Sequence, residues 1–119
     1  MDTGNHSPLR ARIKIDGGGS STAFASATGS RWNLTQGVVT WANLDTSTTI
    51  SLYEFNATNS VQFLTFIASA SHGIVNMDFG EYGVQASSSV ASRLVFNVGT
   101  VGGTVCAFFA GYQTGGSGA

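Results

Sequence analysis

A strict alternation of apolar and basic residues near the N-terminus constrains the fold more than any other feature of this chain. The alternating residues are Leu9, Arg10, Ala11, Arg12, Ile13, Lys14 and Ile15. Successive side chains of a strand point to opposite faces, so a period of two predicts a strand with one face on a core. The other face then carries three of the five basic residues of the protein.

Seven more strands are expected at short, regular intervals along the chain. Each is an apolar run bounded by turn-forming Gly, Asn, Asp or Ser residues. The expected ranges are 22–27, 37–43, 48–55, 61–69, 74–79, 93–98 and 105–112. Helical spacing is absent except for one conceivable turn at 86–91. The sequence therefore predicts an all-β fold, an antiparallel two-sheet sandwich that is jelly-roll-like and has about eight strands.

The length of 119 residues is that of one domain. We expect a single β-sandwich domain over 9–113, preceded by a polar N-terminal arm over 1–8 and followed by a Gly-rich C-terminal tail over 114–119. The arm and the tail contain too few apolar residues to order themselves without a partner.

The chain has few charges, and this excludes several functions. Only 11 of 119 residues are charged, whereas Ser and Thr together supply 28; a soluble domain normally has about a quarter of its residues charged. A surface with so few charges has little of the electrostatic repulsion that keeps monomers apart. With five basic residues and a net charge of −1, nucleic-acid binding is not expected. No apolar stretch approaches the roughly 20 residues of a membrane span, and no secretory signal is visible, so we expect a soluble protein.

No motif indicates catalysis. Asp2-Thr3-Gly4 resembles half of an aspartic protease site but has no second copy, and His72 and Asp78 have no G-x-S-x-G nucleophile. We therefore expect no enzyme, no catalytic residue, no cofactor and no structural metal site. A calcium site built from loop carbonyls with Asp45 or Asp78 stays open. Cys106, the single cysteine, is expected to be a small buried residue of the last strand.

Two of the expected strands have apolar residues on both faces. In one, Ile50 and Leu52 oppose Tyr53 and Phe55; in the other, Leu64 and Phe66 oppose Phe63 and Ile67. The second face needs a cover, which is a loop, a terminal arm or another subunit. We predict a homotrimer whose interface uses these faces and the segment 105–112, with Phe108, Phe109 and Tyr112 as apolar anchors. Trp32, Trp41, Tyr53, Tyr82 and Tyr112 are core or interface anchors, or alternatively a platform on which sugars stack.

The stretch Asp45-Thr46-Ser47-Thr48-Thr49-Ile50-Ser51-Leu52-Tyr53, in a small Ser/Thr/Gly-rich and lysine-poor all-β chain, resembles strands of bacteriophage virion decoration (cement) proteins. This resemblance implies a structural protein that stabilises a capsid as a homotrimer on the virion surface. The implied partner is the major capsid protein or another virion protein. The alternative is a carbohydrate-binding or adhesive β-sandwich module such as a fibre knob.

The basic face of the first strand is the remaining candidate site. Arg10, Arg12 and Lys14 present the one concentrated positive face of the chain, which would complement an acidic scaffold. Alternatively, these side chains keep an exposed strand soluble and block pairing at its edge. The predicted partner-binding residues are therefore Arg10, Arg12, Lys14, Phe108 and Tyr112, with the segment 1–12 as the principal contact to a larger assembly.

Overall fold

The computed structural model describes residues 7–56, 59–69, 71–87 and 90–115, and all regular secondary structure in these residues is β-strand. The strands are β1 (Ser7–Asp16), β2 (Gly19–Ser26), β3 (Ser30–Ala42), β4 (Thr48–Asn56), β5 (Asn59–Ala68), β6 (Gly73–Asp78), β7 (Val84–Gln85), β8 (Ser92–Val98) and β9 (Thr104–Gly115). The predicted all-β fold is confirmed. In the same residues no helix is long and apolar enough to cross a membrane.

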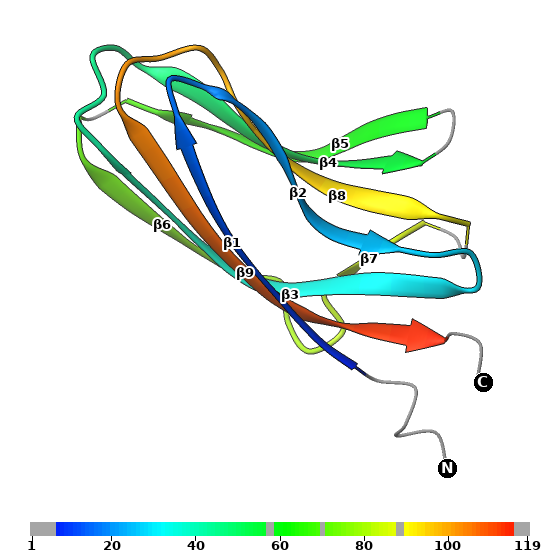
Figure 1. Cartoon of the computed structure of the whole chain (residues 1–119). Coiled ribbons are helices and arrows are strands. Elements are labelled where there is room, and N and C mark those ends of the chain that lie inside the picture. The colour runs from blue at the N-terminus through cyan, green and yellow to red at the C-terminus, as the bar shows by residue number, and fades with distance from the viewer. Residues whose placement is uncertain (1–6, 57–58, 70, 88–89, 116–119) are drawn as a thin grey trace.

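The strands form two antiparallel sheets that pack face to face (Figure 1). The five-stranded sheet has the order β1-β9-β3-β6, with β7 also paired to β3, and the four-stranded sheet has the order β2-β8-β4-β5. Among the described strands, β4 and β5 are the only pair consecutive in sequence that are also hydrogen-bonded neighbours. Because the chain passes between the sheets at most other connections, the topology is jelly-roll-like. The predicted two-sheet sandwich is confirmed, with nine strands instead of about eight.

The first strand follows its sequence pattern. Ile13 and Ile15 are buried, whereas Arg10, Arg12 and Lys14 are exposed. A reversal through Gly17 and Gly18, whose φ angles are +77° and +92°, connects β1 to β2 in the other sheet. A Cβ at Gly18 would lie 2.7 Å from the backbone oxygen of Gly99, so both the backbone conformation and the lack of space require glycine there.

The sequence pattern missed the first half of β3 and all of β7. β3 begins at Ser30 rather than at residue 37, and Trp32, Asn33 and Leu34 are buried in succession, so no alternation marks this part. A bulge between Leu34 and Gln36 shifts the register with β9. The Thr35 hydroxyl at the bulge donates to the backbone oxygen of Ala110 at 3.1 Å.

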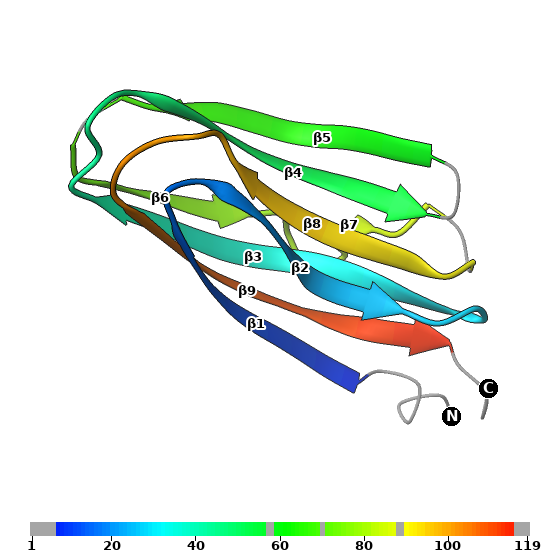
Figure 2. The ribbon, with the colours of Figure 1, turned by 45° about the horizontal axis from the view of Figure 1, so that its top comes forward.

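Most of the predicted arm and tail lies outside the described residues. Of the arm expected over 1–8, Ser7 and Pro8 belong to β1 and pair with Gln113 and Tyr112 of β9. Of the tail expected over 114–119, Thr114 and Gly115 are the last residues of β9. The two ends of the described chain therefore lie on neighbouring strands (Figure 2).

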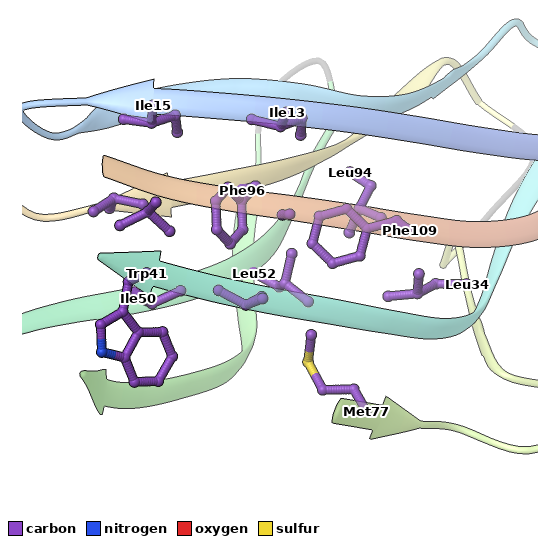
Figure 3. Packing of buried hydrophobic residues seen from close by; sticks show 14 of the residues in the cluster. Ile13, Ile15, Leu34, Trp41, Ile50, Leu52, Met77, Leu94, Phe96 and Phe109 are labelled. Carbon is purple, nitrogen blue, oxygen red and sulfur yellow. The ribbon is translucent and has the colours of Figure 1, made fainter. Parts of the chain in front are cut away.

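The core lies between the sheets, and its largest members are aromatic (Figure 3). Phe96 of β8 and Phe109 of β9 join the two sheets in an edge-to-face contact with ring centroids 5.5 Å apart. The ring centroids of Trp41 and Phe66 lie 6.2 Å apart, and the Trp41 indole occupies the space that a Cβ at Gly73 would need. Trp32 is completely buried and donates from Nε1 to the Ser92 hydroxyl at 3.0 Å. Both tryptophans are thus core residues, and neither belongs to a sugar-stacking platform.

β9 shows why neighbouring residues of one strand have different roles. Phe109 is 0% exposed, so in the folded domain it is unavailable to a second subunit, contrary to its expected place as an interface anchor. Phe108 points to the opposite face and is half-buried. Cys106 is exposed, so the expectation of a buried cysteine is wrong. The pleat puts Cys106 on the same outer face as Phe108.

Phe109→Ala should lower the free energy of unfolding by about 3–5 kcal/mol, because it leaves a cavity against Phe96 between the sheets. Cys106→Ser, on the outer face of the same strand, should change it by no more than about 0.5 kcal/mol. Urea denaturation at one protein concentration measures both values. A large loss for Cys106→Ser would show that the faces of β9 are assigned the wrong way round.

Candidate interaction surfaces

The outer face of the five-stranded sheet is organised in rows that cross four strands. The pairing of β1 with β9, β9 with β3 and β3 with β6 defines three rows: Arg10–Ala110–Gln36–Asp78, Arg12–Phe108–Val38–Asn76 and Lys14–Cys106–Thr40–Ile74. We call these twelve residues, together with Tyr112, the β9 face. Basic side chains occupy its β1 edge, the middle is largely apolar, and Asp78 lies at the β6 edge.

All five residues predicted to bind a partner gather on this face. Arg10, Arg12 and Lys14 come from β1, and Phe108 and Tyr112 occupy positions of β9 that the pleat directs to the same side. The Arg12 guanidinium lies 5.7 Å from the centroid of the Phe108 ring, so the basic and aromatic groups touch each other. Lys14 Nζ is 3.9 Å from Asp16 Oδ2, but both side chains are well exposed and the pair contributes little to stability.

The middle of the β9 face is hollowed on both sides of Phe108. One hollow, of about 510 Å³, is lined by residues that include Lys14, Val38 and Cys106. The other, of about 290 Å³, is lined by residues that include Gln36 and Asp78. Ile74 at the β6 edge is 61% exposed. An apolar, uneven surface with charges at its rim is typical of protein–protein contacts.

The outer face of the four-stranded sheet has a different chemistry. We call it the β4 face, and its members on the four strands are Ser20, Thr22, Thr49, Ser51, Tyr53, Phe55, Ser60, Gln62, Thr65, Ile67, Arg93, Val95 and Asn97. Most are hydroxyl or amide side chains. A groove of about 270 Å³ lies between β2, β4 and β8 and contains the half-buried rings of Tyr53 and Phe55.

The expectation of two strands with apolar residues on both faces holds for β4 but not for β5. In β4, Ile50 and Leu52 are buried in the core, while Tyr53 and Phe55 lie on the β4 face. In β5, a bulge opposite Leu52 and Tyr53 lets Phe63, Leu64 and Phe66 all pack against the core. Of the four residues expected on the two faces of this strand, Ile67 alone, 66% exposed, remains outside the core.

A buried carboxyl group is the residue that the sequence analysis missed. Glu54 of β4 points inward and is 7% exposed. Its Oε2 accepts hydrogen bonds from the Ser87 amide at 3.0 Å, the Ser87 hydroxyl at 3.1 Å and the Ser92 hydroxyl at 2.9 Å. Ser92 also accepts from Trp32, so the network ties β3, β4 and β8 together. The available signal was the inward period Ile50, Leu52, Glu54, which places the carboxyl group in the core.

Glu54→Ala should lower the free energy of unfolding by about 1–3 kcal/mol, because the buried Ser92 hydroxyl loses its acceptor, while the exposed Ser87 can turn to water. Glu54→Gln keeps one oxygen acceptor and should cost clearly less. Denaturant unfolding compares the two variants. If both variants lose the same free energy of unfolding, the network needs both carboxylate oxygens of Glu54, and the shared acceptor Oε2 alone is not sufficient.

The carboxyl groups considered for calcium have other partners. Asp45 Oδ1 accepts from the Gly102 amide at 2.9 Å, and Asp78 Oδ1 accepts from the Gly80 amide at 2.9 Å. Within the described ranges, no three His, Cys, Asp or Glu residues lie close enough together to hold a metal ion. The histidine considered for a triad, His72, has its Nδ1 3.1 Å from the hydroxyl of the adjacent Ser71.

No family model matches this chain, and no curated protein matches it either. Among solved structures, it is similar to a chain in the acidic stable capsid structure of Helicobacter pylori bacteriophage KHP30, with a TM-score of 0.57, 12% identity and coverage of 95% of this chain and 90% of that one. At this identity the likeness shows a shared fold.

Two weaker matches are PirA, with a TM-score of 0.49, 9% identity and coverage of 86% and 93%, and a chain of infectious bursal disease virus strain Gx, with a TM-score of 0.27, 10% identity and coverage of 93% and 37%. Scores this low establish no common fold, so no argument rests on either match.

Proposed function

We propose that this protein is a non-enzymatic structural component of a virion, a capsid decoration protein that stabilises the shell as a homotrimer. The observation that carries the proposal is the β9 face, where an apolar centre is bordered by basic and acidic edges on one sheet. The fold that this protein shares with a chain of a phage capsid structure supports a place in a virion. The low charge of the whole chain supports the same role, because it favours packing over repulsion.

The size and chemistry of the β9 face suit contact with other copies. The strands β1, β9, β3 and β6 have 10, 12, 13 and 6 residues and lie about 4.8 Å apart, so the whole outer face of this sheet, with the β9 face as its central part, covers roughly 600 Å² in projection, against ~800 Å² per partner of a stable interface. Phe108 and Val38 supply apolar area at its centre, and Ile74 supplies it at the β6 edge.

The β1 edge also gives the protein a way to attach to a shell. Arg10 and Arg12 are exposed and form no ion pair with the described residues. In the sequence, the segment 1–6 precedes the strand that carries them. A negatively charged capsid surface would therefore meet the segment 1–12 and its arginines together.

The oligomeric state tests the self-association. Wild-type protein should sediment as a trimer at micromolar concentration, and Phe108→Asp should give monomers because it places a carboxylate in the apolar centre of the β9 face. Thr49→Asp, an exposed position on the β4 face, is the matched control and should remain trimeric. Sedimentation velocity measures all three. A monomeric wild type would contradict the proposed trimer.

Attachment is tested on particles. Deleting residues 1–6, which leaves β1 intact, should preserve the melting temperature and remove the protein from purified particles. Arg10→Glu combined with Arg12→Glu should weaken binding, more so at low salt, where the attraction is least screened. Occupancy is measured by quantitative mass spectrometry and cryo-electron microscopy of the particles. Wild-type occupancy of the deletion variant would place the attachment surface on the folded domain instead.

A further inference from the structure

The β4 face has a composition that the β9 face does not share. Its four strands contain only two charged residues, and one of them, Glu54, points into the core. Arg93 of β8 is therefore the single charge that the described strands of this sheet present to solvent. The register places Ala25 of β2 and Phe55 of β4 directly beside it, and the hydroxyl residues Ser20, Ser21 and Thr22 line the same groove.

Arg93 is held in place without being neutralised. Its guanidinium carbon lies 4.7 Å from the centroid of the Phe55 ring, on the neighbouring strand β4. A guanidinium stacked on an aromatic ring keeps the N–H groups at its edge free for a planar acceptor. In the described part of the chain no carboxyl group forms an ion pair with Arg93, since the only such pair joins Lys14 and Asp16. The site thus offers a fixed, unpaired cation.

The groove beside Arg93 supplies the other groups that a ligand would meet. Tyr53 and Phe55 are two residues apart on β4, so their rings lie about 7 Å apart on the same face. Val95 forms the floor, and the β2 residues Ser20, Ser21 and Thr22 line the opposite wall. Aromatic rings stack on the apolar faces of sugar rings, and hydroxyl side chains exchange hydrogen bonds with sugar hydroxyls.

We propose that this groove binds a saccharide that bears a carboxylate, such as a sialic or uronic acid. The carboxylate pairs with the Arg93 guanidinium, a sugar ring stacks on Tyr53, and the β2 hydroxyls contact the sugar hydroxyls. Charge complementarity selects the acidic sugar, because a neutral ligand would leave the guanidinium unpaired. A protein partner is less suited to this groove, whose lining is largely polar, than to the apolar centre of the β9 face.

The test uses nuclear magnetic resonance titration of the ¹⁵N-labelled full chain with 3′-sialyllactose and, separately, with tri-galacturonic acid. Lactose is the neutral match for the first probe, and inorganic phosphate controls for binding of any anion. At least one acidic probe should give saturable shifts of the Tyr53, Phe55, Arg93 and Val95 amides. Lactose and phosphate should bind at least tenfold more weakly, since they lack either the charge or the sugar ring.

Arg93→Gln should weaken binding at least tenfold, and Tyr53→Ala should weaken it with Arg93 retained. Arg31→Gln is the control, because Arg31 is an arginine of the other sheet that donates to Gln85 and has no part in this groove; it should leave binding unchanged. Melting temperatures show whether each variant is folded. Failure of both acidic probes to bind, equal binding by lactose, or equal binding by Arg93→Gln would overturn the proposal. None of these outcomes bears on the oligomeric state or on particle occupancy, so the proposed structural role is tested independently.

Discussion

The contact between Phe96 and Phe109 fixes how the two sheets lie against each other, and the surfaces of the molecule follow from it. β9 is a central strand of the five-stranded sheet, paired with β1 on one side and β3 on the other. Once Phe109 points inward, the pleat directs Phe108 outward. The registers with β1 and β3 then place Arg12 and Val38 on either side of Phe108. The β9 face therefore depends on a core residue that is not itself part of it.

Glu54 has a comparable effect on the other side of the sandwich. By accepting three hydrogen bonds from Ser87 and Ser92, its carboxyl group holds the chain that leads into β8. β8 carries Arg93 next to Ser92, and the register with β4 sets Arg93 opposite Phe55. A buried polar network thus fixes the position of the one outward cation of this sheet. Because unsatisfied buried donors are costly, the arrangement has few alternatives.

Much of the fold could be predicted from the sequence where side chains alternate. In β1, apolar and basic residues alternate strictly, and its inward face is confirmed, although the strand runs from Ser7 to Asp16 and so includes two residues of the expected arm. The first half of β3 could not be found, because Trp32, Asn33 and Leu34 are all buried and a bulge interrupts the pleat. Cys106 was misplaced because an apolar run hides which of its residues face outward. Only the register of β9 with β1 and β3 shows which side chains of β9 face outward.

The five residues predicted to bind a partner lie on one face, but the extent of this face could not be predicted. These residues come from β1 and β9, whereas Val38, Ile74 and Asp78 join them only through the pairing of β3 with β9 and β6. The β4 face was beyond sequence analysis, because Arg93 and Phe55 are far apart in the chain and meet only across a strand pair.

The two faces lie on opposite sides of one sandwich, and this decides what they can do together. Packed sheets are about 10 Å apart, so a partner that covers the β9 face leaves the β4 face open to solvent. Burying an apolar face against protein is favourable. Burying hydroxyls and an unpaired guanidinium is unfavourable, because these groups lose their hydrogen bonds to water and receive none in return. The physical chemistry of the two faces therefore supports the proposal that the β9 face makes the assembly contact. In the proposed virion setting, the β4 face with Arg93 is directed toward the surroundings, where a soluble or cell-surface saccharide can reach it.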